Sequence, residues 1–151
     1  MQQAAILEAA NIIGGLRVRP KAFAGLAVAL APNDADAAYD IQDAVHDWFR
    51  APGFGARIGY KIGCTTPVMQ NYMGIVHPCA GGLFEARLYT SPAEIDCASL
   101  NRGGVECEIA VEMGAPLDAR DMTIDQGRAA EAIAALYPAI EVVDDRYQDI
   151  M

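Results

Sequence analysis

Apolar residues recur at helical spacing in two stretches near the N-terminus. In residues 2–13 the apolar positions fall three to four residues apart, and a Gly-Gly pair at 14–15 follows them directly. In residues 37–49 a stripe of Ala, Ile, Val, Trp and Phe repeats at the same spacing, and Asn33 or Asp34 precedes it in the position of a helix cap. We therefore expect a short helix that ends at the glycine pair and a clearer second helix, in which His46 is interpreted as a surface residue.

A strand and a short helix are expected next along the chain. Residues 56–63 alternate in the manner of a strand and carry Lys61 near the end. Thr66 is a typical helix cap, and the proline that follows it suits a first helical turn. A helix over residues 67–73 is therefore predicted, with Gly74 closing it.

Further short elements are predicted in the second half of the chain. Residues 77–82 are expected to form a loop whose small side chains permit close approach of a ligand. Short strands are expected at 83–89 and 94–95. A capping box at 123–126 predicts a helix that Pro138 ends. Helices followed by strands with interspersed helices fit an α+β or mixed α/β fold.

Carboxylates interrupt two apolar runs, residues 105–111 and 138–144, that otherwise have the composition of buried strands. Because side chains of a strand alternate between faces, Glu106 and Glu108 are expected on one face, roughly 7 Å apart along the strand. Glu141 on the other run is positioned to join them. Three carboxylates with no His or Cys suit a hard divalent cation such as Mg²⁺ or Mn²⁺. The alternative is a solvated face of an edge strand, where Glu serves solubility alone.

The overall charge excludes two classes of partner. The chain has 151 residues, 53% hydrophobic and 21% charged, which is typical of one globular domain, and its net charge is −9. Binding to nucleic acid or to an anionic membrane surface requires clustered Lys and Arg, so neither is expected. An anionic small molecule would need a local cation to hold it.

Cysteine spacing and the N-terminal sequence bear on the compartment. The four cysteines lie far apart without a CxxC pair, which favours reduced thiols over a zinc site or a disulfide framework. No apolar run reaches the length of a membrane span, and residues 1–10 lack the basic start of a signal peptide. A cytoplasmic protein is expected.

Several motifs in this order resemble one known family. The chain resembles the fumarylacetoacetate hydrolase superfamily, and most of all its branch of 2-keto-4-pentenoate hydratases, 2-oxohept-4-ene-1,7-dioate hydratases and 4-oxalocrotonate decarboxylases. The motifs that carry the resemblance span nearly the whole chain and are Ala38–Gln42, Gly59–Gly63 with Thr65–Pro67, Gly74–Ile75, Gly82–Phe84, Glu106–Ala110 and Pro138–Asp144 with Arg146.

The resemblance implies an α+β fold with an N-terminal helical region, residues 1–55, and the first part of a mixed β-sandwich roll, residues 56–151. Members of the family continue well beyond this length, and their C-terminal portion completes the roll. Strands that should pair with those of this chain are therefore expected to be missing, which would leave open sheet edges and exposed apolar surface. We interpret the chain as a fragment of a longer product, the alternatives being a short chain that needs a partner and one that does not fold alone.

The same resemblance implies the parts of an active site. Glu106, Glu108 and Glu141 are expected to bind Mg²⁺ or Mn²⁺, with Lys61 reaching into the same pocket to pair with a substrate carboxylate or to exchange a proton. A 2-oxo acid would chelate the ion through its carboxylate and keto oxygens. The residues implied to contact substrate are Thr65, Thr66, Gly82 and Leu83.

Cys79 departs from the family pattern. Hydratases of this type carry an Asp in the corresponding loop as a candidate for handling the proton or water, and a neutral thiol does not replace a carboxylate base unless its pKa falls strongly. His77 is the nearby substitute. Lys61, Cys79 and His77 are thus the expected catalytic residues.

The predicted activity is a metal-dependent hydro-lyase that adds water to a 2-hydroxy-2,4-dienoate in the degradation of aromatic compounds. The alternatives within the superfamily are a 4-oxalocrotonate-type decarboxylase and an acylpyruvate hydrolase. A further alternative is a non-catalytic binding or assembly subunit. The expected partner is a small-molecule substrate, and a homo-oligomer is expected.

Overall fold

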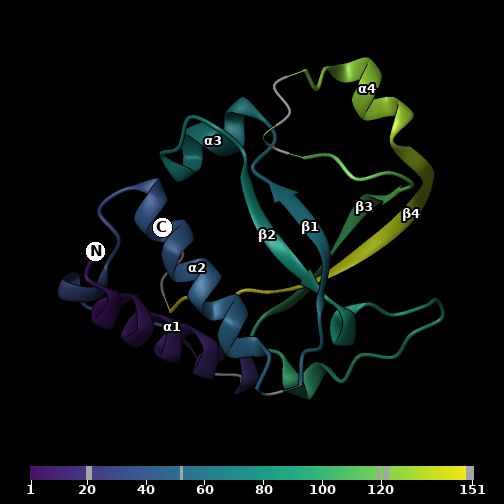
Figure 1. Ribbon diagram of the computed structural model, residues 1–151. Coiled ribbons are helices and arrows are strands. Elements are labelled where there is room, and N and C mark those ends of the chain that lie inside the picture. The colour runs from purple at the N-terminus through teal and green to yellow at the C-terminus, as the bar shows by residue number, and fades with distance from the viewer. Residues whose placement is uncertain (20–21, 52, 119, 121–122, 149–151) are drawn as a thin grey trace. The chain divides into compact units, whose positions relative to one another are not determined.

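The computed structural model describes residues 1–19, 22–51, 53–118, 120 and 123–148 (Figure 1). The chain forms two compact units, one comprising Met1–Ser99 with the residues from Arg146 onward, and the other comprising Leu100–Asp145. The division at residue 55 expected from the sequence remains a prediction. The helices and strands of the first unit are α1 (Gln3–Val18), α2 (Ala35–Phe49), β1 (Arg57–Gly63), α3 (Pro67–Met73) and β2 (Cys79–Phe84), and those of the second are β3 (Gly103–Met113), α4 (Gln126–Glu131) and β4 (Ile133–Asp144).

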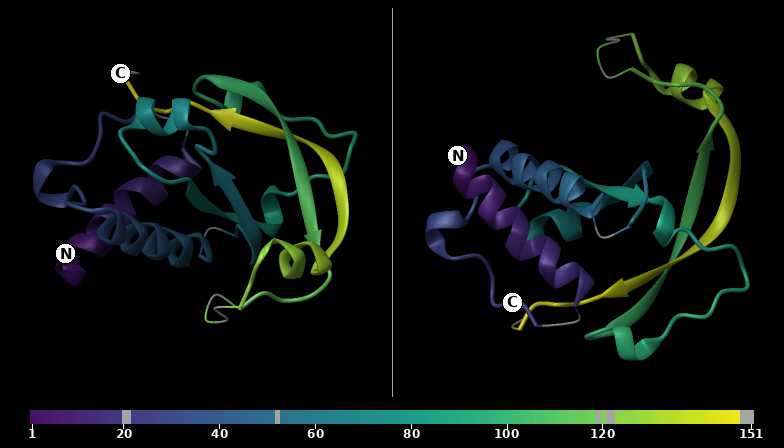
Figure 2. Two further views of the ribbon diagram at one scale, coloured as in Figure 1. Left: turned by 90° about the horizontal axis from the view of Figure 1, so that it is seen from above. Right: turned by 60° about the horizontal axis from the view of Figure 1, so that its bottom comes forward.

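Helices α1 and α2 pack against each other and form most of the core of the first unit (Figures 1 and 2). The expectation that the glycine pair at 14–15 ends the first helix is wrong, because α1 continues to Val18. Gly14 is buried, and a Cβ there would lie 2.5 Å from the indole of Trp48. A glycine inside the helix therefore allows α2 to approach closely. The buried core residues around this contact are Ile6, Ala9, Ala10, Ile41, Val45, Phe49, Phe54 and Phe84.

Helices α2 and α3 begin at side-chain caps. The Asp34 carboxylate accepts a hydrogen bond from the backbone N–H of Ala37 at 2.8 Å, which selects Asp34 over Asn33 as the cap of α2. The Thr66 hydroxyl accepts from the Met69 N–H at 3.3 Å, and α3 ends at Gly74 with a left-handed φ of 67°. The predicted boundaries of α3 are confirmed.

Strands β1 and β2 form an antiparallel pair in which Gly63 lies opposite Cys79 and Lys61 opposite Gly81. The second strand therefore begins at Cys79, inside the stretch expected to be a loop. The strands expected at 83–89 and 94–95 are wrong: β2 ends at Phe84, residues 85–87 form a 3-10 turn, and residues 94–95 are not in a strand. Phe84 is the last residue of β2, and its ring is buried in the core. The ring lies edge-on to that of Phe49, with 5.2 Å between the two ring centroids.

Strands β3 and β4 form a long antiparallel ribbon in the second unit, running side by side in every view (Figures 1 and 2). The helix expected to run from the capping box at 123–126 to Pro138 is wrong. Asp125 caps α4, which ends at Glu131, and β4 starts at Ile133 and includes Pro138. A proline lacks a backbone N–H, but among the described strands β4 pairs with β3 alone, so the ribbon tolerates the proline.

Apolar side chains are exposed along one face of this ribbon, as expected for strands without further partners. Ile109 and Ile140 are 72% and 73% exposed. In the described residues each sheet has two strands, so one edge of every strand lacks a pairing strand. The mixed α+β class is confirmed. Among the described helices none is long and apolar enough to cross a membrane.

Candidate metal centre

The second face of the β3–β4 ribbon gathers three carboxylates. Glu106 lies directly opposite Glu141 in the ladder, and Glu108 lies two residues further along β3 on the same face. One carboxylate oxygen from each residue lies within 4.8 Å of the other two. The structure therefore brings together the three residues that the sequence marked as candidate ligands.

The chemistry of this cluster fits a hard divalent cation. Glu106 and Glu108 are exposed and Glu141 is half-buried, so the oxygens are accessible from solvent. Three like charges at such distances repel one another, and a cation of charge +2 among them removes this repulsion. Oxygen donors without nitrogen or sulfur select Mg²⁺, Mn²⁺ or Ca²⁺ over Zn²⁺ or Cu²⁺.

Asp144, at the end of β4, has a structural role. Its Oδ1 accepts hydrogen bonds from the backbone N–H groups of Asn101 and Arg102 at 2.7 and 2.9 Å. Arg102 in turn forms an ion pair with Asp145 at 3.0 Å. These contacts fix the entry into β3 next to the end of β4 and thereby hold the register that pairs Glu106 with Glu141.

A tyrosine and a fourth glutamate lie further along the acidic face. Tyr137 on β4 donates a hydrogen bond from its hydroxyl to Oε2 of Glu112 on β3 at 2.6 Å. This hydrogen bond is the main cause that raises the pKa of Tyr137. The sequence did not indicate this pair, because the capping box at 123–126 and Pro138 predict a helix that includes Tyr137. The continued alternation from Glu106 through Glu108 to Glu112 was the signal that could have found it.

The other predicted site residues belong to the first unit. Lys61 is half-buried on β1 with its stem beside Gly81, and the Thr66 side chain caps α3. His77 is exposed, and its Nδ1 lies 2.8 Å from the carbonyl oxygen of Pro78. Their participation in one pocket with the glutamates remains a prediction, as do the substrate contacts of the following residues: Thr65 and Leu83, which are exposed, and Gly82, which is half-buried.

His46 is not the surface residue that the sequence indicated. Its side chain is only 12% exposed, and its ring lies 5.3 Å from that of Phe84, edge to face. Burial lowers the pKa of His46, and the neighbouring Arg57 lowers it further, whereas Asp43 and Asp47 oppose the shift. The helical pattern did not reveal this because the side of α2 that carries His46 is covered by β2, a contact distant in sequence.

The backbone of β2 at Gly82 passes against this histidine. A Cβ at Gly82 would lie 3.0 Å from Nε2 of His46 and 3.1 Å from the Arg57 side chain. The requirement for a glycine here thus comes from packing within the first unit.

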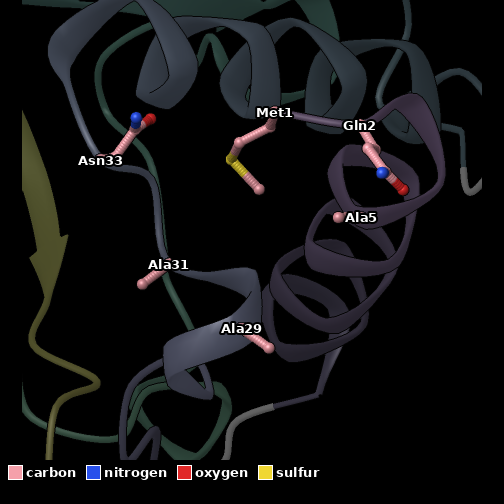
Figure 3. A pocket seen from close by; sticks show the side chains of 6 residues that line it. All are labelled: Met1, Gln2, Ala5, Ala29, Ala31 and Asn33. Carbon is pink, nitrogen blue, oxygen red and sulfur yellow. The ribbon is translucent and has the colours of Figure 1, made fainter.

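The first unit also has a shallow hollow of about 290 Å³ beside the start of α1 (Figure 3). Its lining offers amide and thioether groups and no charged side chain. The residues that line it are Met1, Gln2, Ala5, Ala29, Ala31 and Asn33.

Comparisons with known proteins identify relatives. No protein-family model matches the sequence. The chain is 36% identical over 130 residues to the 2-keto-4-pentenoate hydratase of Paraburkholderia phymatum, a match that covers 84% of this chain and 47% of the relative. It is 35% identical over 119 residues to the TodF product hydratase of Pseudomonas putida, covering 78% and 42% of the two chains.

A solved structure has the same fold. The 4-oxalocrotonate decarboxylase from Pseudomonas putida G7, complexed with magnesium and adipate, superposes with a TM-score of 0.88 at 25% sequence identity, over 99% of this chain and 56% of that one. A second structure of that decarboxylase, with calcium and acetate, gives 0.87. This chain spans about half the length of the relatives it matches.

These similarities show the fold class of the chain, which is that of the fumarylacetoacetate hydrolase superfamily. Within that superfamily it is a homologue of the 2-keto-4-pentenoate hydratases over about half of their length. The resemblance to this superfamily that the sequence motifs indicated is therefore confirmed.

Proposed function

We propose that this chain carries the metal-binding part of a hydro-lyase that adds water to a 2-hydroxy-2,4-dienoate. The observation that carries the proposal is the convergence of Glu106, Glu108 and Glu141 on one face of the ribbon, with ligand atoms within 4.8 Å of one another. It is supported by relatives that are named hydratases and by a decarboxylase of the same fold whose structures contain magnesium or calcium.

The three glutamates would hold Mg²⁺ or Mn²⁺, with Mg²⁺ supported by the related structure. When bound, the ion supplies positive charge that stabilises enolate-like charge on a 2-oxo acid. Three carboxylates leave part of a usual octahedral shell for other oxygen ligands, which suits a chelating carboxylate and keto group. This is the reason that the donor set favours 2-oxo acids over substrates with a single oxygen ligand.

Lys61 is proposed to bind the substrate carboxylate. Its ammonium group is the cation within the Gly59–Gly63 motif, and an anionic substrate needs such a partner in a chain of net charge −9. Cys79 and His77 are proposed to take part in proton transfer. The dienoate would become the 2-oxo-3-enoate by proton transfer, and water would then add across the conjugated double bond.

A second candidate is decarboxylation of a 4-oxalocrotonate-type substrate, which requires the same stabilisation of an enolate. The TM-score of 0.88 to the decarboxylase favours it. A further sequence match to a 4-oxalocrotonate decarboxylase of Pseudomonas putida, at 32% identity, covers 61% of this chain.

The two activities are distinguished by their products. Purified chain would be incubated with 2-hydroxypenta-2,4-dienoate, or with 4-oxalocrotonate, in the presence of Mg²⁺, Mn²⁺ or a chelator. We expect metal-dependent formation of a hydroxylated 2-oxo acid, lost in Glu106→Gln and retained in Glu112→Gln, which changes the same face outside the cluster. Release of carbon dioxide without hydration would establish the decarboxylase, and turnover that is unaffected by the chelator would exclude both metal-dependent activities.

A further inference from the structure

Two cysteines that are distant in sequence meet at the end of the β1–β2 ladder. Gly63, the last residue of β1, lies opposite Cys79, and a Cβ at Gly63 would lie 3.4 Å from the Cys79 sulfur. Cys64 follows Gly63 directly in the chain. Hydrogen bonding with the Cys79 side chain is the main cause that raises the pKa of the Cys64 thiol. The register of the ladder therefore places the two cysteines beside each other in the reduced protein.

The backbone on both sides of this contact is held in place by helices. The Gln70 side chain of α3 donates a hydrogen bond to the carbonyl oxygen of Cys64 at 2.9 Å. Ala80, next to Cys79, donates its N–H to the Tyr39 hydroxyl at 3.1 Å and accepts at its carbonyl from Gln42 at 2.9 Å, both from α2. Bringing the thiols together therefore requires little further ordering of the chain.

Cys64 has an unusual conformation. Its φ is 54°, in the left-handed region that non-glycine residues rarely adopt. Such a conformation persists only where the surroundings determine it. Cys64 lies directly after the end of β1, in the short connection to α3.

We propose that Cys64 and Cys79 form a dithiol site that is oxidised to an intramolecular disulfide by a low-molecular-weight disulfide such as oxidised glutathione. Cys79 is exposed and Cys64 half-buried, so the Cys79 sulfur meets the oxidant first. This site shares Cys79 with the proposed proton transfer, but its test measures the masses of peptides and does not use hydro-lyase activity as a readout.

The reaction balances in two exchanges. The Cys79 thiolate attacks one sulfur of the oxidant, the S–S bond of the oxidant breaks, and one glutathione thiolate leaves with the bonding pair. The Cys64 thiolate then attacks the Cys79 sulfur of this mixed disulfide and displaces the second glutathione thiolate. In total the two cysteines lose two protons and two electrons, and one oxidised glutathione becomes two reduced molecules.

The positions of Lys and Arg in the sequence make this testable by peptide mapping. No Lys or Arg lies between Lys61 and Arg87, so trypsin releases Cys64 and Cys79 together in the peptide 62–87. Cys97 falls in the peptide 88–102 and Cys107 in the peptide 103–120, each alone. The native full chain would be treated with oxidised glutathione, alkylated with iodoacetamide and digested with trypsin. The masses of the peptides would then be measured by mass spectrometry.

We expect the peptide 62–87 to lose two hydrogen atoms and to resist alkylation, with dithiothreitol reversing both changes. Cys64→Ser should instead leave a stable glutathione adduct on Cys79, while the control Cys97→Ser should behave as the wild type. Glutathione retained on Cys79 beside an alkylated Cys64 in the wild type would overturn the proposal, as would crosslinks to Cys97 or Cys107. Because the wild-type map alone decides between these outcomes, the test does not depend on the folding of any variant.

Discussion

At the scale of single residues, the carboxylate cluster carries an electrostatic cost when no cation is bound. Oxygens of Glu106, Glu108 and Glu141 lie within 4.8 Å of one another, and like charges at this separation repel. Replacing Glu108 by Gln removes one of the three charges and keeps the shape of the side chain. We expect Glu108→Gln to raise the melting temperature slightly at low ionic strength without divalent ions, and the difference to shrink at high salt.

The matched control is Glu112→Gln. Glu112 lies on the same face of β3 but accepts a hydrogen bond from Tyr137, so replacing its carboxylate by a neutral amide weakens a favourable interaction. A gain in melting temperature from Glu112→Gln equal to that from Glu108→Gln would indicate a general effect of the acidic chain instead of repulsion in the cluster.

His46 gives a pH dependence whose sign follows from its surroundings. Burial, and then Arg57, lower its pKa below 6.5, so at mildly acidic pH the unfolded chain binds a proton that the folded chain does not. The corresponding stability is fully present above pH 6.5 and is lost as the pH falls through the lowered pKa. We expect urea unfolding to show that acidification from neutral pH destabilises the wild type more than His46→Gln. An equal loss in both would contradict this assignment, because Asp43 and Asp47 are retained in the variant.

The residues of the candidate site could be predicted to different extents. The alternation of a strand was enough to place Glu106 and Glu108 on one face, because this period is a local property. The sequence pattern offered Glu141 as a third ligand, but its position opposite Glu106 depends on the register of β3 and β4, which the period of a single strand does not determine. The hydrogen bond between Tyr137 and Glu112 and the burial of His46 were missed, because both depend on contacts between elements.

At the scale of elements, the contact between α1 and α2 depends on a glycine in the middle of a helix. A methyl group at Gly14 would overlap the indole of Trp48, whereas one at Gly15 would meet nothing within 4 Å. We expect Gly14→Ala to destabilise the chain by about 1–3 kcal/mol through overpacking. Gly15→Ala should stabilise it by about 0.5–1 kcal/mol because alanine favours the helix. Chemical denaturation monitored by circular dichroism would measure the free energy of unfolding of both variants. Equal effects of the two substitutions would show that Gly14 is not packed against Trp48.

The elements that were predicted correctly have strong local signals. The caps at Asp34 and Thr66, with Pro67 after the latter, determine where α2 and α3 begin whatever the rest of the chain does. Pro138 misled the prediction, because a proline commonly ends a helix and also occurs in strands with an unpaired edge. Only the pairing with β3 decides between these two structures.

At the scale of the whole molecule, the second unit is a ribbon with one acidic and one apolar face. The apolar face includes Val105, Ile109, Leu136, Ile140 and Val142, all exposed. A patch of this kind binds hydrophobic dyes. We expect the chain to enhance the fluorescence of anilinonaphthalene sulfonate at neutral pH. Replacing both Ile109 and Ile140 by Thr should reduce the signal, since Thr keeps the β-branched shape that favours a strand.

A control for the dye experiment lies in the first unit. Val28, which is 94% exposed in a 3-10 turn, belongs to the first unit and not to the ribbon. Val28→Thr should leave the fluorescence unchanged. A reduction as large as that caused by the ribbon variant would locate the dye elsewhere on the molecule.

The most direct test of the central claim is binding of Mn²⁺ to the three glutamates, measured by isothermal titration calorimetry with and without oxalate as a mimic of the pyruvoyl group of a 2-oxo acid. The account predicts that the wild type and Glu112→Gln bind Mn²⁺ with similar affinity and more tightly with oxalate. Glu106→Gln and Glu141→Gln should each weaken binding by about tenfold or more, because the number of charged ligands sets the affinity. Absence of binding by folded wild-type chain, or binding equal in all four proteins, would contradict the assignment of a metal centre to this face.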